Sequence, residues 1–490
     1  MYSFILSLLA LVAGYFLYGR LVERIFGPDP ARPTPAVSHS DGVDFITMPS
    51  WKVFMIQFLN IAGTGPIFGA IMGAKFGPSA YLWIVLGCIF AGAVHDYLTG
   101  MLSVRHDGAG LPEIVGKYLG QGTKKVLLVF SILVLLLVGT VFVYSPALIL
   151  GDMAGDGTKT AIMLWVLVIF LYYIFATMLP IDKIIGKIYP LFAFALLFMA
   201  VALMVCLFIK WPSIPELWDG LGNLGEARGL ISGQTVFPCL FITIACGAVS
   251  GFHATQSPLM ARCIQNEKMG RPVFYGAMIT EGIVALIWAT VSSWFFFDGG
   301  AAEVGSDLAA AAPAVVTKVA SSWLGIVGGI LAVLGVVAAP ITSGDTAFRS
   351  ARLIIADFLK FEQKPVRNRI LISIPLFCAA SLLLWYNVAD ENGFNVIWRY
   401  FGWANQTLAV FSLWTAAVYL AKHGSGRLSY LVAMIPAAFM TAVCTTYICV
   451  AKIGFNLPDT WNWHIGTATF VVSLVLFYLW KCRKAKAQRS

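Results

Sequence analysis

The sequence predicts an all-α membrane protein that crosses the bilayer many times, and three observations lead to this fold class. The chain has 490 residues, of which 59% are hydrophobic and only 12% are charged, and its mean hydropathy is +0.82. Apolar stretches of about 20 residues, enough to cross a bilayer core of roughly 30 Å, recur along the whole chain. Basic residues gather in alternate loops between these stretches.

We expect about 13 transmembrane helices. In chain order they are placed at residues 3–19, 51–74, 79–102, 125–150, 160–179, 189–209, 236–260, 273–297, 323–345, 370–388, 398–421, 428–451 and 465–480.

The distribution of basic residues tests this count, because Lys and Arg are retained on the cytoplasmic side during insertion. With the N-terminus outside, the loops on the cytoplasmic side hold 26 of the 33 Lys and Arg residues, and the outer side holds the other seven. A missed span would invert every later loop and destroy this sorting. The net charge of +9 therefore indicates orientation in the membrane, with a cytoplasmic C-terminus, and argues against a nucleic-acid partner.

Two of the expected spans are interrupted near the middle of the membrane. The first contains Gly63, Gly65 and Pro66, and the second contains Gly247 and Gly251. Unpaired backbone groups in hydrocarbon cost several kcal/mol each, so an irregular segment at this depth must face protein, water or a ligand. Given the order of the spans, the first broken helix runs from the cytoplasmic side of the membrane to the outer side, and the second runs in the opposite direction.

The two breaks divide the chain into related parts. Each broken span is followed by four more, which defines a first five-helix repeat at 51–210 and a second, inverted repeat at 236–421. Residues 1–50 form an N-terminal helix and a Pro-rich linker that we expect to be extended, and residues 428–490 form two further helices and a basic tail. Broken helices at matching positions of inverted halves are typical of secondary transporters, whose binding site lies between the halves. Two kinks that serve only packing are the alternative.

The chemistry at the breaks favours a negatively charged group. Pro66 suits the first turn of a helix, and Thr64 or Gly65 in the first break and Ser250 in the second are expected capping residues. Two helix N-termini would then present N–H donors and partial positive charge to the gap. We expect a small organic anion or zwitterion as substrate.

Five ionisable residues lie within the expected spans: His95, Asp96, His253, Glu281 and Asp345. Such residues are costly in a membrane and usually have a function. His253 adjoins a break, and an imidazole that titrates near neutral pH suits proton coupling, although a hydrogen-bonded structural histidine is the alternative. For His95 and Asp96, which point about 100° apart on a helix, hydrogen bonding between helices is the favoured role. Glu281 either pairs with a basic residue or relays protons.

Two polar segments of later spans leave their roles open. Asp345 has Thr342 and Ser343 beside it, so these oxygens could bind sodium or the carboxylate could take up a proton. Alternatively, Asp345 forms a structural ion pair with Arg349, one helical turn further on. The polar run 405–407 either lines the cavity or holds neighbouring helices together.

These same segments resemble a known family. The stretches "NIAGTGPIFGA", "GCIFAGAVHDY", "TIACGAVSGFHATQSPLMARC" and "SGDTAFRSARL" are similar to the carbon starvation protein A family of peptide and pyruvate transporters. The resemblance spans most of the chain. It implies a place in the amino acid-polyamine-organocation superfamily, a leucine-transporter-like core of two inverted five-helix repeats, alternating access, and a location in the bacterial inner membrane.

The resemblance also implies site residues. It places Gly63, Thr64, Gly65, Ser250, Gly251 and His253 at the substrate, and Thr342, Ser343 and Asp345 where related folds hold sodium or a charged substitute. Pyruvate, short peptides and amino acids all remain candidate substrates.

Three functions are weighed. The leading one is a proton-coupled importer of a small carboxylate or short peptide, without cofactor, in which His95, Asp96, Glu281 and Asp345 serve coupling. A sodium-coupled symporter is second. The third is an intramembrane enzyme with a metal at His95, Asp96 and His253, which is disfavoured because HExxH is absent and the spacing is poor for ligation. We therefore expect no enzymatic activity.

Overall fold

The computed structural model describes residues 1–42, 44–155, 157–178, 181–363, 365–390 and 393–487, and this part of the chain is helical without any strand. Its first half contains α1 (Tyr2–Phe16), α2 (Tyr18–Phe26), α3 (Pro35–Ser38), α4 (Ser50–Ile61), α5 (Gly65–Ala74), α6 (Ser79–Gly87), α7 (Ala93–Arg105), α8 (Leu111–Leu119), α9 (Gln121–Gly155), α10 (Lys159–Met178), α11 (Ile181–Lys210) and α12 (Leu224–Ala227). The second half contains α13 (Phe241–Thr243), α14 (Gly251–Ala261), α15 (Gly276–Phe297), α16 (Gly300–Glu303), α17 (Ala312–Leu359), α18 (Val366–Ala389), α19 (Gly393–His423), α20 (Leu431–Val450) and α21 (Asn462–Ala487).

Ten helical segments of the described chain are long and apolar enough to cross a membrane, and the bent pair α4 and α5 raises the number to 11 if it counts as one span. The structure does not confirm the expected 13. One difference lies at 236–260, where the chain is divided into pieces too short to span alone. The other lies at 398–421, where α19 is long enough but carries the polar side chains of Asn405 and Gln406, which lower its hydropathy.

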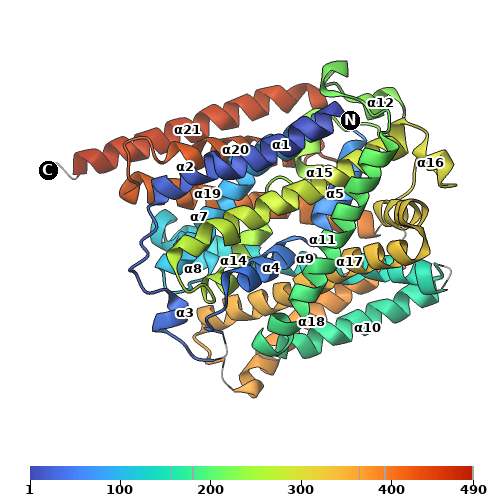
Figure 1. Cartoon of the computed structure of the whole chain (residues 1–490). Helices are drawn as coiled ribbons and strands as arrows, with labels where there is room; N and C mark the ends of the chain where they lie inside the picture. The colour runs from blue at the N-terminus through green and yellow to red at the C-terminus, as the bar shows by residue number, and fades with distance from the viewer. Residues whose placement is uncertain (43, 156, 179–180, 364, 391–392, 488–490) are drawn as a thin grey trace.

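Long helices run side by side through the bundle (Figure 1), and α17 is its central element. It packs along α9, α11 and α10, and α19 packs against α20 and α9. Pro146 lies inside α9 and Pro340 inside α17, and the backbone of Gly325 leaves the helical region with a φ of 66°. The helix labelled α17 is therefore a short segment from Ala312 joined at this glycine to the long membrane helix.

The start of the chain and the end of α21 lie at opposite ends of the bundle (Figure 1). At the first end, the N-terminal ammonium group of Met1 forms an ion pair with Glu216, which also accepts hydrogen bonds from the backbone N–H groups of Tyr2 and Ser3. An odd number of membrane crossings would separate the two ends in this way.

The Pro-rich linker that follows α2 crosses the end of α14. Thr34 donates its hydroxyl to the carbonyl of Ile264 at 2.6 Å. Two backbone N–H groups, of Ile46 and Met48, donate to carbonyls of the segment that follows α14. The N–H of Asp29 donates to the carboxylate of Glu267 at 2.6 Å. We call residues 27–42 and 44–49 the strap, because they join the N-terminal helix to this end of the broken helix.

Candidate functional site

The first break separates α4 from α5, which are inclined by 51° to each other. Residues 62–64 lie between them, and α5 begins at Gly65 with Pro66 in its first turn. A proline is tolerated there because its missing N–H would have no partner inside the helix. Thr64 occupies the capping position, but its side chain forms no capping hydrogen bond. The expected break is therefore present, whereas the expected cap by Thr64 is not formed.

The second break lies between α13 and α14, where residues 244–250 are not helical. Ser250 precedes α14 with an extended backbone, but its hydroxyl does not cap the helix. Asn405 of α19 does so instead, because its side-chain oxygen accepts the N–H of Phe252 at 2.7 Å. The same amide contacts the Ser250 hydroxyl at about 3 Å through both its oxygen and its nitrogen. Of the two expected helix N-termini, that of α14 is thus partly occupied by a side chain.

The two breaks pack directly against each other. A Cβ atom on Gly65 would collide with the side chain of Cys246, and one on Gly69 would lie 2.8 Å from the carbonyl oxygen of Thr243. A Cβ atom on Gly247 would lie 3.7 Å from the Cα of Pro66. Glycine is required here because two irregular backbone segments approach more closely than side chains allow. Residues from the two halves of the sequence therefore meet at one place.

Four of the five ionisable residues predicted from the sequence form one continuous chain next to the second break. Asp96 of α7 lies 2.7 Å from Nδ1 of His95 and 2.8 Å, through its other oxygen, from Nδ1 of His253. On the far side, Nε2 of His253 lies 3.4 Å from the carboxylate of Glu281 on α15. This contact has the distance of an ion pair but not the geometry of a hydrogen bond, since both Glu281 oxygens lack a hydrogen-bond partner.

The protonation pattern of this chain follows from its acceptors. An ionised carboxylate only accepts hydrogen bonds, so both imidazoles place their Nδ1 proton toward Asp96. The Nε2 atom of His253 is then the position at which a further proton binds, facing Glu281. All four side chains are completely buried. Within the described residues, no group of three or more His, Cys, Asp or Glu side chains is arranged to hold a metal ion.

Asp345 lies in a second polar cluster, on α17. Its Oδ2 atom accepts a hydrogen bond of 2.6 Å from the hydroxyl of Tyr189 on α11, and the hydroxyl of Tyr172 on α10 lies 3.5 Å away. The ion pair between Arg349 and Asp345, one of the two alternatives left open by the sequence, is not formed in the described structure, and Arg349 donates to the carbonyl of Ala176 at 2.8 Å. Neither tyrosine was predictable from the sequence, because nothing in the pattern tells which aromatic residue faces which helix.

This second cluster touches the first break. Ser343 donates its hydroxyl toward the carbonyl of Leu59, in the last turn of α4, at 3.0 Å. Thr342 bonds to carbonyls of its own helix, and its own carbonyl accepts the hydroxyl of Tyr189 at 3.1 Å. A buried acidic cluster therefore lies beside each break. The cluster at the first break includes residues of α17, and the cluster at the second break is formed by residues of α7, α14 and α15.

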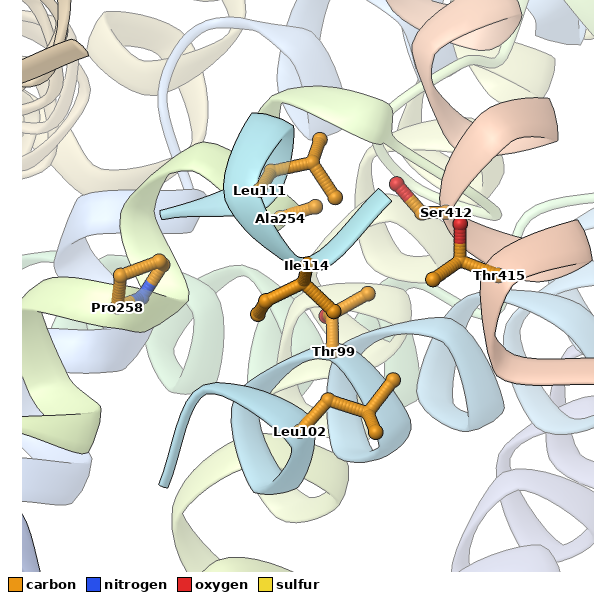
Figure 2. A pocket seen from close by; sticks show the side chains of 8 residues that line it. All are labelled: Thr99, Leu102, Leu111, Ile114, Ala254, Pro258, Ser412 and Thr415. Carbon is orange, nitrogen blue, oxygen red and sulfur yellow. The ribbon is translucent and has the colours of Figure 1, made fainter. Parts of the chain in front are cut away.

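Two small cavities lie beyond His253, toward the end of α14. The first is about 10 Å³ and the second about 20 Å³, each of a size for ordered water. Figure 2 shows the first, whose lining side chains come from α7, α8, α14 and α19. They are Thr99, Leu102, Leu111, Ile114, Ala254, Pro258, Ser412 and Thr415. Both cavities are lined by Leu111 and Pro258. The two cavities are therefore neighbours, and the second reaches Arg262, next to the segment that the strap contacts.

The fold is that of a multi-pass helical membrane protein in which two broken helices meet beside a buried chain of titratable residues. Residues 1–155, 147–323 and 298–447 match the family model described as carbon starvation protein CstA. The matched residues cover most of the chain, which therefore belongs to the CstA family.

The chain is also similar to individual relatives, and to a solved structure in fold alone. The chain is 27% identical to the peptide transporter CstA of Escherichia coli, over 90% of this chain and 80% of that protein. It is 28% identical to the pyruvate/proton symporter BtsT of the same organism, over 57% of this chain and 46% of that protein. It is also 46% identical to an uncharacterized membrane protein of Haemophilus influenzae, over 60% of this chain and 91% of that protein. A manganese transporter of Eremococcus coleocola has a similar fold, with a TM-score of 0.58 and 10% identity over 91% of this chain and 99% of that chain.

Proposed function

We propose that this membrane transporter is a secondary active importer of a small carboxylate or short peptide, driven by protons through alternating access. The observation that carries the proposal is the contact between the two broken helices, next to a buried chain of titratable groups. A substrate held at this contact touches elements of both halves of the sequence. Movement of one half against the other can then expose the substrate to one side of the membrane at a time.

The proposal includes the membrane arrangement expected from the sequence. It has 13 spans with the N-terminus outside and the C-terminus in the cytoplasm of a bacterial cell, and inverted five-helix repeats at 51–210 and 236–421. The flanking parts are residues 1–50 and 428–490. The positions of the chain ends at opposite ends of the bundle support an odd number of spans.

The substrate site is proposed at the breaks, lined by Gly63, Thr64, Gly65, Ser250, Gly251 and His253. The start of α5 offers the partial positive charge of a helix N-terminus, although Pro66 has no N–H and the N–H groups of Ile67 and Phe68 donate to the carbonyl of Thr64. At the start of α14, Asn405 accepts the N–H of Phe252. The partial positive charge of the two helix starts favours a single carboxylate group between them.

Coupling is proposed at the pair formed by His253 and Glu281. A proton on either member changes the charge of a completely buried pair, and the interaction with Asp96 fixes which imidazole nitrogen is available. When the pair takes up this proton from one side of the membrane and releases it to the other side, the flow of protons is tied to the position of α14. His95 and Asp96 hold the imidazole of His253 in place.

A sodium-coupled version is the second candidate, and one observation favours it. Oδ1 of Asp345 is buried without a hydrogen-bond partner, and the buried Thr342, three residues earlier on α17, lies on the same face of that helix. Oxygen atoms of this kind bind alkali and alkaline-earth cations.

Reconstitution separates the two versions. The purified protein is placed in proteoliposomes, and uptake of labelled pyruvate and of labelled dialanine is measured under an imposed proton gradient, an imposed sodium gradient, or neither. Accumulation driven by protons alone is expected. Accumulation that requires sodium and ignores the proton gradient would transfer the coupling role to the Asp345 cluster. Absence of uptake of any small carboxylate, peptide or amino acid in protein that remains folded would refute the proposal.

A further inference from the structure

Three polar side chains at the first break have no hydrogen-bond partner. Gln57, Asn60 and Thr64 are completely buried, and every side-chain nitrogen and oxygen of the three is unpaired within the protein. Buried polar groups in folded proteins are almost always paired, so each exception requires a physical cause. None of the three takes part in the polar clusters around Asp96 and Asp345.

The buried carboxamides that lack hydrogen-bond partners are concentrated on α4. Among the described residues, three buried carboxamides have both their nitrogen and their oxygen unpaired, and two of them, Gln57 and Asn60, belong to α4. The third is Asn387, on α18. At the opposite break the amide of Asn405 is fully engaged with the start of α14. The two sides of the contact thus differ. The buried amide at the second break is hydrogen-bonded within the protein, whereas the buried amides near the first break are not.

One of the three residues, Thr64, belongs to the proposed substrate site, and the other two lie on the helix that leads to it. Gln57 and Asn60 are three residues apart, which places them on the same face of α4. Asn60 is in the last turn of the helix, two residues before the irregular segment, and Thr64 ends that segment. The carbonyl of Leu59, between the two amides in sequence, contacts Ser343. The face is therefore part of the first broken helix where it meets its neighbours.

The chemistry of these groups limits what can satisfy them. Two carboxamides offer four N–H donors and two carbonyl acceptors. A simple carboxylate such as pyruvate only accepts hydrogen bonds, so it would leave both amide oxygens unpaired. A molecule that carries a carboxylate together with an ammonium group or a peptide N–H has donors for these oxygens and acceptors for the N–H groups.

We propose that Gln57 and Asn60 determine specificity by binding the N–H groups of the substrate, so that the transporter prefers zwitterionic molecules with N–H donors to simple carboxylates. This inference rests on the proposed transport function, of which it defines the substrate class. A site built to pair with a polar group discriminates strongly against analogues that lack the group, because its own buried atoms are then left unpaired.

The test compares two competitors in proteoliposomes, dialanine and pyruvate, against whichever of the two labelled compounds the wild-type protein takes up. The ratio of their half-inhibitory concentrations is measured for the wild type and for Asn60→Leu, Gln57→Leu and Asn60→Asp. Asn387→Leu is the matched control, because it removes the other fully unpaired carboxamide. Thermal unfolding in detergent shows whether each variant is folded.

The variants are expected to change the ratio in opposite directions. In the wild type dialanine competes at least about tenfold better than pyruvate, and Asn60→Leu and Gln57→Leu each reduce this preference about tenfold or more. Asn60→Asp keeps an acceptor and attracts the ammonium group of dialanine, which pyruvate lacks, so it increases the preference, which a general loss of stability would not do. Asn387→Leu leaves the ratio unchanged.

Different results overturn the inference. If the wild type prefers pyruvate, or if the ratio is the same in all variants while uptake continues, these amides are satisfied by water and do not select the substrate. If the folded wild type takes up neither compound nor any other small acid, amino acid or peptide, the transport function itself fails, and this result is distinct from an unchanged ratio.

Discussion

The substitution Asp96→Asn tests most directly whether the buried histidine chain serves coupling. Asp96 accepts a hydrogen bond from each of two imidazoles, at 2.7 and 2.8 Å. Asparagine has nearly the same shape but only one acceptor atom, so its NH₂ group would face one of the two Nδ1 protons. That imidazole must then change its tautomer or turn away.

The size of the effect follows from these contacts. A hydrogen bond to a charged group contributes about 1.5–3 kcal/mol, and the substitution removes at least one of them. Since about 1.4 kcal/mol corresponds to a factor of ten, we expect proton-driven uptake to fall by about one to two orders of magnitude. The change in buried charge adds to this effect, because the imidazole of His253 loses the charged partner next to it.

Two assays on the same proteoliposomes separate coupling from folding. Proton-driven accumulation should fall as described, while exchange of labelled for unlabelled substrate at equal pH on both sides should be retained to a greater extent. Glu113→Gln is a suitable control, because it makes the same chemical change in an exposed pair with Lys124 that contributes at most about 1 kcal/mol. Wild-type accumulation by folded Asp96→Asn protein would refute the coupling role of the chain.

Three further predictions concern single residues of the breaks and the clusters. His253→Ala should insert into the membrane normally but lose proton-driven accumulation, whereas equal uptake with and without the imidazole would leave it a structural role only. Asp345→Asn should impair transport because it replaces the buried carboxylate that accepts the hydroxyl of Tyr189 with a neutral amide, and a sodium titration of uptake in this variant shows whether a cation site has been lost. Gly251→Ala should lower the melting temperature, because the new Cβ atom would lie 2.3 Å from the backbone nitrogen of Ala409 and 2.3 Å from the carbonyl oxygen of Asn405, and such overpacking costs about 1–3 kcal/mol or more; an unchanged melting temperature would show that α14 and α19 can separate at little cost.

The sequence predicts the class of fold well because the membrane restricts it strongly. The interruption at Gly63 to Pro66 was predictable, since glycine and proline close together in an apolar span disrupt the helix at a depth where unpaired backbone is costly. The count of spans was less certain at α19, where Asn405 and Gln406 make a helix less apolar than its neighbours. Hydropathy alone cannot tell that such a helix is shielded by packing.

The candidate site was predictable as a set of residues but not as a geometry. The five ionisable residues are recognisable because each is unusual in an apolar span, yet their pairing depends on how distant helices rotate against each other. Asp345 and Arg349 illustrate the limit: their spacing permits an ion pair within one helix, whereas the structure has tyrosine at the carboxylate. Gln57 and Asn60 carried a usable signal, since two amides three residues apart precede a break.

The strap has an energetic consequence for the transport cycle. Four of its hydrogen bonds, through Thr34, Ile46, Met48 and Asp29, join it to the end of α14 and the residues that follow. At about 0.5–1.5 kcal/mol each, their combined contribution is of the order of the roughly 5.5 kcal/mol that converts a 1:99 mixture of two conformations into 99:1. If these bonds form in only one of the two conformers, the strap can set the resting balance between them, and changes in its length or sequence are then a route to slower or faster turnover without any change in what is carried.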